Sequence, residues 1–308
     1  MDIGVVLVTF NRINDLKVAL KKYEDQIKQP KYIVVVNNNS TDGTFELLQE
    51  WKEEKAEFNK YVINLEKNIG GSGGFYTGLK ESLELDADWI WVADDDAYPE
   101  EDALSKIEEF YDKNNIKNRN DVSAICATVI NHGQVDVGHR RRVETTFLKV
   151  KDCTTEVSEY KNNDYIEINI FSYVGSVINK EHLKKAGLTD KDLFIFCDDT
   201  EHSYRLSKTG KIFCVSNSKV IHDSIPMKDG YINWKEYYML RNKLFFIKRD
   251  FNWRYFFLLY NKLLIKCLIK KISNPNDTLN NVKLAALKDA KNDVKGLHAI
   301  YKPGWKSK

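Results

Sequence analysis

Residues 3–92 alternate between short apolar runs and segments in which apolar residues recur every three or four positions. Such alternation is typical of parallel strands joined by helices that cover the sheet. The apolar runs predict four strands, over Ile3–Val8, Tyr32–Val36, Tyr61–Leu65 and Trp89–Val92. The amphipathic segments predict three helices, over Asn14–Lys28, Thr44–Glu54 and Gly74–Leu85. This part of the chain is therefore predicted to be a Rossmann-like, mostly parallel sheet.

The pattern becomes more mixed after Asp121. Further strand-like runs occur over Val122–Ile130, Tyr165–Ile178, Lys211–Val215 and Val220–His222, and a basic loop surrounds His139–Arg142. The chain then becomes rich in aromatic and basic residues and is predicted to be helical to its end. We expect an α/β fold with a main domain over residues 1–240 and a helical region over residues 241–308.

Composition and charge exclude several classes of protein. With 308 residues, 43% of them hydrophobic, the chain can form one large core but not several domains. Lysine and arginine total 47 against 45 acidic residues, so the net charge of +2 does not indicate a nucleic-acid partner. The five cysteines are scattered and odd in number, which favours a reducing, cytoplasmic compartment. We expect no signal peptide, and no run approaches the ~20 apolar residues that span a bilayer.

A cluster of three carboxylates, Asp94–Asp96, directly follows the fourth predicted strand. Ligands of open α/β sheets gather at this edge of the sheet. In an extended segment Asp94 and Asp96 would point to one side and Asp95 to the other, a spacing that suits a hard divalent cation. The cluster can equally be an acidic turn that starts a helix at Pro99.

Polar or glycine-rich segments also follow the other three strands. The segment Asn68–Phe75 carries four glycines, so its backbone can approach a phosphate or sugar closely, although it lacks the lysine of a P-loop. Thr9 and Arg12 follow the first strand, and Asn37 and Asn38 follow the second. Amides there can contact a base, and Arg12 can reach a phosphate, although each can also be an ordinary cap or turn residue.

A second acidic group, Asp198-Asp199-Thr200-Glu201, follows the apolar residues Phe194–Cys197. An apolar wall beside paired carboxylates raises the pKa of one member, which suits a general base near neutral pH. The alternative is a helix N-terminus with an acidic first turn. His222 follows another strand and can complete the coordination of a cation held by Asp94 and Asp96, although a lone histidine is more often structural.

Taken together, these segments resemble the inverting glycosyltransferases of family 2, which have the GT-A fold. The resemblance covers roughly residues 1–250 and rests on the order of the motifs, which are Val6–Arg12, Val36–Thr44, Asn68–Phe75, Asp94–Asp96 and Asp198–Glu201. The double-glycine segment and the triple aspartate are similar to those of bacterial galactofuranosyl- and rhamnosyltransferases.

The resemblance implies roles for individual residues. Asp199 matches the catalytic base, and Asp94, Asp96 and His222 match ligands of Mg²⁺ or Mn²⁺. The implied donor-binding residues, together with those we expect from the chemistry of the strand ends, are Thr9, Arg12, Asn37, Asn38, Asn68, Gly70, Gly71, Asp94 and Asp95. Asn37 departs from the family pattern, in which an aspartate commonly contacts uracil. On the acceptor side we expect Phe75, Tyr76, Asp198, Glu201 and the stretch Tyr231–Trp234.

The resemblance further implies transfer of a sugar, with UDP-galactofuranose as the first candidate donor and dTDP-rhamnose as the second. The acceptor would be a carbohydrate or a lipid-linked saccharide of a cell-surface polysaccharide. Lys262, Lys266 and Lys270 form a basic stripe beside an apolar helix face, so the region either contacts the inner face of the membrane or packs on the catalytic domain. A nucleotidyltransferase would need a basic glycine-rich loop after the first strand. A non-catalytic carbohydrate-binding protein would have little use for two carboxylate clusters.

Overall fold

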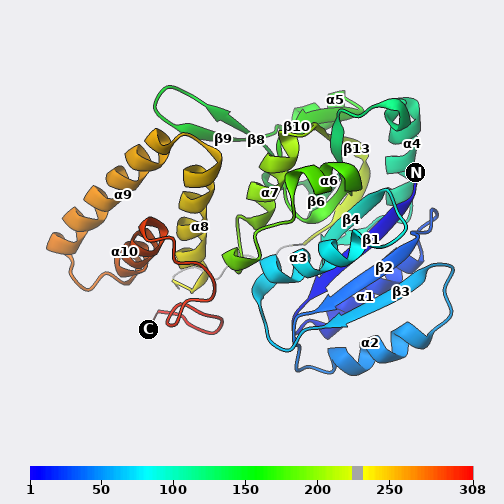
Figure 1. Cartoon of the computed structure of the whole chain (residues 1–308), viewed down its shortest axis with the longest axis horizontal. Helices are drawn as coiled ribbons and strands as arrows, with labels where there is room; N and C mark the ends of the chain where they lie inside the picture. Colours follow the sequence, from blue (N-terminus) through cyan, green and yellow to red (C-terminus); the bar gives the residue numbers. More distant parts are fainter. Residues whose placement is uncertain (224–231, 308) are drawn as a thin grey trace.

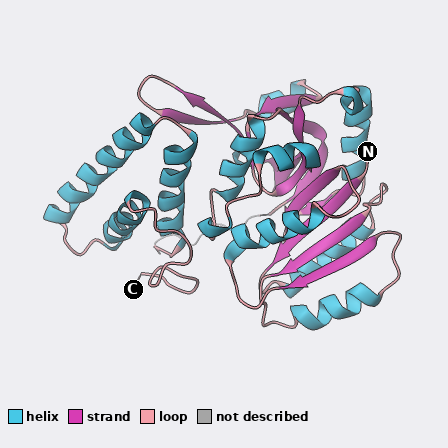
Figure 2. Cartoon of the chain, in the orientation of Figure 1, coloured by secondary structure: helices cyan, strands magenta, loops and turns pink. Residues whose placement is uncertain are grey.

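The computed structural model describes residues 1–223 and 232–307, in which ten strands form one large sheet (Figures 1 and 2). The main path of the sheet runs in the order β10-β13-β6-β12-β4-β1-β2-β3. One half of this path is parallel and the other is mixed, so the predicted α/β fold class is confirmed.

The parallel half contains the four strands predicted first. They are β1 (Ile3–Thr9), β2 (Tyr32–Asn37), β3 (Asn59–Asn64) and β4 (Trp89–Asp94). Strand β1 lies between β2 and β4 and is buried along its whole length, which explains its continuous apolar run.

Side chains on successive residues of β1 serve two hydrophobic cores, because they point to opposite faces of the sheet. Val5 and Leu7 pack in the core that contains helix α1 (Ile13–Glu24) and helix α2 (Thr44–Glu53). Val8 packs in the second core, with helix α3 (Gly70–Ser82).

The mixed half corrects two predicted strand boundaries. Its long strands are β6 (Val122–Asn131), β10 (Tyr165–Ile168), β12 (Val174–Asn179) and β13 (Lys211–Ile221), and the short strands β5 (Tyr98–Pro99) and β7 (Gln134–Val135) pair beside them. The single run predicted over 165–178 is wrong, since the chain leaves the sheet at Asn169, whose side chain bonds the backbone N–H and carbonyl of Val143 at 2.7 and 3.0 Å. Conversely, the two runs predicted over 211–222 are one strand with an irregularity between Val215 and Lys219.

A second, three-stranded sheet joins β11 (Ile170–Phe171) to the hairpin formed by β8 (Arg140–Thr145) and β9 (Val150–Thr154). Arg140 anchors this hairpin, because its fully buried guanidinium donates to the carbonyl oxygens of Ala127 at 2.7 Å and Val174 at 2.6 Å. Figure 1 shows the hairpin extending from the main sheet toward the C-terminal helices.

Short helices connect the strands of the mixed half. They are α4 (Ala103–Lys113), α5 (Val157–Asn162), α6 (Lys180–Ala186) and α7 (Asp198–Ser207), with single turns η1 (Ile116–Asn118), η2 (Val137–His139) and η3 (Lys191–Leu193). The alternative in which the acidic cluster starts a helix at Pro99 does not hold, because Pro99 belongs to β5 and pairs with Val220.

Three longer helices complete the chain: α8 (Lys235–Asp250), α9 (Trp253–Ser273) and α10 (Thr278–Lys291). They pack on one another beside α7 (Figure 1). Residue 240 lies inside α8, so the predicted division after it would cut a continuous helix. Among the described residues, no helix combines the length and the apolar character needed to cross a membrane.

Candidate active site

The loops after β1 and β2 are joined at the carboxyl edge of the sheet. The backbone N–H of Asn38 donates to the carbonyl of Thr9 at 2.9 Å. Asn11 Oδ1 accepts from the backbone N–H of Thr41 at 2.7 Å, and the Asn11 N–H donates to Ser40 Oγ at 3.0 Å. The polar residues after these two strands therefore form one connected surface, as the topology of a parallel sheet requires.

The acidic cluster lies beside this surface. Asp94 ends β4, and the chain turns directly after it, with the Ala97 N–H donating to the Asp94 carbonyl at 3.2 Å. The prediction that Asp95 and Asp96 point to opposite sides is wrong, because this turn lets both side chains reach Arg12. Arg12 donates to Asp95 at 3.2 Å and forms an ion pair with Asp96 as well.

Burial and mutual repulsion determine the charge states of this cluster. Burial raises the pKa of Asp95 to about 6, even though Arg12 opposes that shift. Burial, followed by the charges of Asp96 and Asp95, raises the pKa of Asp94. Burial acts in the same sense on Asp96, but His222 and Arg12 outweigh it and lower its pKa. Three carboxylates thus share one arginine, an arrangement that a further cation would stabilise.

His222 follows β13 and lies against the cluster, with its Nε2 3.4 Å from Asp96 Oδ1. Asp96 Oδ1 and His222 Nδ1 are both buried without a hydrogen-bond partner, which fits atoms that ligate a metal. The described residues contain no group of three or more His, Cys, Asp or Glu side chains arranged as metal ligands. The set Asp94, Asp96 and His222 therefore stays a prediction, although Asp96 and His222 do lie together.

The side chains of Asn37 and Asn38 hold the loops in place. Asn37 is buried, donates to Asn64 Oδ1 at 2.9 Å and accepts from the Ser40 N–H at 2.9 Å. Asn38 donates to the Gly70 carbonyl and accepts from the Ile69 N–H, each at 2.9 Å. These bonds join β2 to the start of α3.

Asn68 and the glycine-rich segment form the start of a helix. Asn68 Oδ1 accepts from the Gly70 N–H at 2.8 Å, and α3 begins at Gly70, earlier than predicted. Gly70 has φ +79°, and a Cβ placed on it would lie 1.9 Å from the carbonyl oxygen of Phe194. A Cβ on Gly71 would have no neighbour within 4 Å. Gly70 is thus required for close packing against the protein itself, whereas only Gly71 of this pair leaves open space for a ligand.

The contact with Phe194 brings the second acidic group to the same place. Ser72 at the start of α3 donates its N–H to the Phe194 carbonyl at 3.2 Å. Phe194, Phe196 and Cys197 all have positive φ, at 71°, 64° and 67°. Such conformations are strained for residues other than glycine and concentrate at functional sites. Here they precede Asp198 directly.

Asp198 and Asp199 begin helix α7 and differ in their surroundings. Asp198 is buried, and burial together with the charge of Asp199 raises its pKa to about 7, against the effect of the neighbouring Ser72 hydroxyl. Asp199 is half-buried, and burial raises its pKa as well. Its Oδ1 accepts from the N–H and the hydroxyl of Thr200 at 2.5 and 3.1 Å. Burial thus raises the pKa of both carboxyl groups, and the apolar wall beside them stays a prediction.

Arg141 on β8 reaches this pair from the second sheet. Its Nη2 donates to Thr200 Oγ1 at 2.9 Å, and its Nη1 forms an ion pair with Asp152 on β9. The positive charge of Arg141 opposes the effect of burial on the pKa of Asp199, but the pKa remains raised. Asp199 is therefore connected through Thr200 to a cation on another sheet.

The expected acceptor residues have different environments. Phe75 is buried against Tyr173, with ring centroids 4.4 Å apart. Tyr76 and Trp234 are half-buried, and Lys191 Nζ lies 5.4 Å from the centre of the Tyr76 ring. Tyr231 lies outside the described residues. Tyr76 and Trp234 are thus partly exposed to solvent, whereas Phe75 packs in the core.

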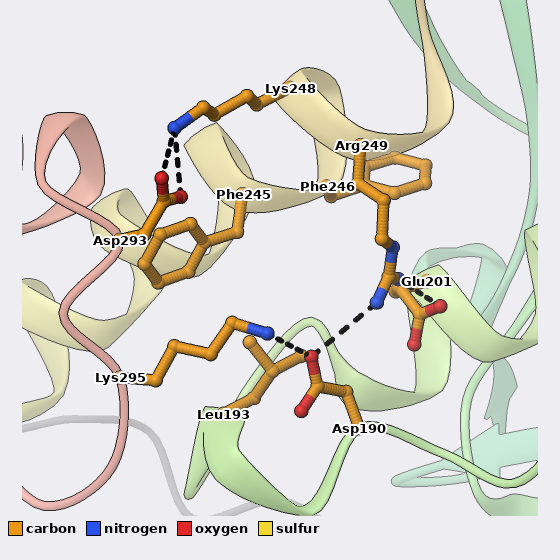
Figure 3. Close-up of a pocket in the computed structure, with 9 residues that line it drawn as sticks. All are labelled: Asp190, Leu193, Glu201, Phe245, Phe246, Lys248, Arg249, Asp293 and Lys295. Atoms are coloured by element: carbon orange, nitrogen blue, oxygen red, sulfur yellow. Dashed lines mark hydrogen bonds and ion pairs between the residues drawn. The ribbon is translucent and has the colours of Figure 1, made fainter.

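Glu201 lines a cavity of about 310 Å³, together with residues of α8 and of the segment after α10 (Figure 3). It is 1% exposed and forms ion pairs with Arg205 and Arg249. Around it, Asp190 pairs with Lys295 at 2.6 Å. Glu201 therefore has the contacts of a residue that joins helices.

Sequence reasoning did not assign roles to four residues that the structure brings to the site. They are Ser72, His139, Arg141 and Lys235. The ring of His139 lies 5.2 Å from that of His222, and burial, followed by the charge of Arg140, lowers its pKa to about 4. Burial and the nearby charge of Arg12 lower the pKa of Lys235. The sequence carried a signal for three of them, since Ser72 lies in the glycine-rich segment Asn68–Phe75 and His139 and Arg141 lie in the basic loop.

Comparison with solved structures identifies the fold. S. aureus TarS 1-349 in complex with UDP-GlcNAc matches with a TM-score of 0.59 at 16% identity, over 96% of this chain and 82% of that one. The mannosyltransferase PcManGT from Pyrobaculum calidifontis, in complex with GDP-Man and Mn²⁺, matches with a TM-score of 0.57 at 14% identity, over 95% of this chain and 86% of that one. The fold is that of the GT-A glycosyltransferases, as predicted.

The model of glycosyl transferase family 2 matches residues 4–187, which is more than half of the chain. The chain belongs to this family.

Three curated relatives agree with the family. Galactofuranosyltransferase GlfT1 of Mycolicibacterium smegmatis is 34% identical over 94 residues, 30% of each chain. GlfT1 of Mycobacterium tuberculosis is 24% identical over 209 residues, 68% of this chain and 65% of its own. The chain thus spans less than two thirds of the length of both. The dTDP-rhamnosyl transferase RfbF of Shigella flexneri is 24% identical over 262 residues, 81% of each chain.

Proposed function

We propose that this protein is a metal-dependent, inverting glycosyltransferase that takes a sugar from a nucleotide diphosphate donor. One observation carries the proposal: two acidic groups, far apart in the sequence, lie at one edge of the sheet. Asp198 is close enough for its charge to raise the pKa of Asp94. A donor diphosphate beside Asp94–Asp96 would therefore place its sugar toward Asp198 and Asp199.

The donor side would use the surface after β1, β2 and β4. Arg12, whose side chain is 47% exposed, would contact the diphosphate, and Thr9 and Asn38 would line the nucleotide site. Asp96 and His222, with Asp94 adjacent, would hold Mg²⁺ or Mn²⁺. The buried, unpartnered atoms of Asp96 and His222 support this assignment. When bound, such a cation neutralises charge on the departing diphosphate.

The acceptor side would use Asp199 as general base. The acceptor hydroxyl gives its proton to the Asp199 carboxylate, and the oxygen forms a bond to the anomeric carbon as the bond to the diphosphate breaks. The displacement is in line, so the anomeric configuration inverts. Tyr76 and Trp234 would offer aromatic faces to the acceptor sugar.

The first candidate donor is UDP-galactofuranose, because two relatives are galactofuranosyltransferases. A second candidate is dTDP-rhamnose, since RfbF matches over the larger share of both chains. The acceptor would be a carbohydrate or a lipid-linked saccharide of a cell-surface polysaccharide, and peripheral contact of the C-terminal helices with the membrane would bring the enzyme to it.

Calorimetric titration with UDP and dTDP, each with and without Mn²⁺, tests the donor side. We expect tight, metal-dependent binding of one nucleotide, and binding of neither would refute the proposal. The variant Asp199→Asn tests the base. Its turnover should fall by a factor of ~10² or more while nucleotide affinity stays nearly unchanged. Unchanged turnover would exclude Asp199 as the base.

A further inference from the structure

Helix α9 exposes a large apolar stripe. The exposed fractions include 55% for Phe257 and Ile265, 63% for Ile269 and 84% for Ile272. With 3.6 residues per turn, these residues lie on one side of the helix, and Leu258 and Leu268 lie among them.

The opposite side of α9 is the one that packs on the protein. Phe256, Leu259, Leu263 and Leu264 contact the core formed with α8 and α10. Within residues 1–223 and 232–307, the helix thus has one apolar side that is covered and another that is open to solvent. A helix that is apolar on both sides is expected to be covered on both.

Basic residues border the open stripe. Lys262 and Lys266 lie along one edge and Lys271 along the other, as the helical spacing requires. The segment Trp253–Ser273 contains five basic residues and no acidic residue, in a chain whose net charge is only +2.

The tip of the β8–β9 hairpin extends the same surface. Phe147 and Leu148 at this tip are 78% and 64% exposed. The guanidinium of Arg254 lies 5.0 Å from the centre of the Phe147 ring, and Tyr255 Oη donates to the Thr146 carbonyl at 2.9 Å. Figure 1 shows the hairpin reaching the N-terminal end of α9.

We propose that the hairpin tip and the open side of α9 form one surface that docks on an anionic lipid bilayer. The apolar residues match the interior of such a membrane, and the lysines on the two edges match its headgroups. A second copy of this chain fits less well, because two α9 helices face to face would bring like charges together without an acidic partner. The inference deepens the membrane contact named in the proposed function, since it identifies the surface that makes the contact, and it requires neither donor nor acceptor.

Vesicle co-sedimentation of the full chain tests this surface. We expect binding to vesicles of phosphatidylglycerol and phosphatidylcholine, weaker binding at high salt, and little binding to phosphatidylcholine alone. The double variant Lys262→Gln/Lys266→Gln should lose about fivefold in affinity per lysine. The hairpin variant Phe147→Ser/Leu148→Ser should lose about tenfold.

Matched controls lie on distant parts of the chain. Ile27→Ser removes an apolar side chain that is 69% exposed, and Lys52→Gln/Lys55→Gln removes two exposed lysines. Both should bind vesicles as the wild type does. All these positions are exposed, so thermal unfolding should confirm that each variant is folded.

Three results would overturn the inference. They are wild-type protein that does not bind anionic vesicles, a hairpin variant that binds as well as the controls, and a dimer in light scattering that the hairpin variant dissociates. Nucleotide binding measured without vesicles is independent of all three, so failure of this inference is distinguishable from failure of the proposed transferase activity.

Discussion

The charge of Arg141 should tune the base that we propose. The two hydrogen bonds of 2.9 and 3.1 Å through Thr200 place its guanidinium no more than about 6 Å from Asp199 Oδ1. At an effective dielectric constant of ~20, a charge pair at that distance interacts by about 3 kcal/mol. The Arg141 side chain is 22% exposed, so we discount this to about 1–2 kcal/mol.

The substitution Arg141→Gln removes the positive charge that lowers the pKa of Asp199. Burial still raises that pKa, so it should rise further and Asp199 should hold its proton over a wider pH range. The expected result is a fall in kcat/KM of about tenfold below neutral pH, with recovery as the pH rises. The acid limb of the pH–rate profile should move to higher pH.

Arg142→Gln is the matched control, because Arg142 lies on the same strand but pairs with Glu159 at 2.7 Å. Its pH–rate profile should coincide with that of the wild type. The assay is transfer or slow donor hydrolysis, measured from about pH 6 to about pH 9. An Arg141→Gln variant that loses the same factor at every pH would refute the reasoning and assign Arg141 a different role, such as binding phosphate.

Two further predictions concern stability. Gly70→Ala should destabilise the fold by at least about 2 kcal/mol in urea unfolding, because φ is +79° and the Phe194 carbonyl blocks a Cβ. The control Gly71→Ala has open space around the added Cβ and should stay within about 1 kcal/mol of wild type. Equal effects of the two substitutions would contradict this packing. The pKa of Asp198 is raised to about 7, so folding retains a proton that the unfolded chain releases, and stability from this group falls as the pH rises from about 4 to about 7. Asp198→Asn should therefore be more stable than wild type at about pH 8 by roughly 1–4 kcal/mol and equal to it near pH 4, and the idea fails if the two unfolding curves coincide at both pH values.

The sequence by itself determined the parallel half of the fold. A buried parallel strand needs an unbroken apolar run, and a crossover helix needs one apolar side, so the strands and helices of residues 3–94 are encoded locally. The polar residues after those strands were also predictable, because parallel topology brings their ends to one edge. For the same reason Asp94–Asp96 could be assigned to the site.

Only the tertiary structure decided how the site is assembled. Thr200 meets Arg141 across 59 positions of sequence, and the Phe194 carbonyl meets the helix that begins at Gly70. No local pattern encodes such contacts, since they depend on how separate elements pack. The glycines of Asn68–Phe75 were predicted to bind a ligand, because the absence of a Cβ allows close approach. A neighbouring backbone needs the same absence of a Cβ, so the sequence could not distinguish the two. The hairpin against α9 arises in the same way, from packing between segments whose sequences carry no signal for each other.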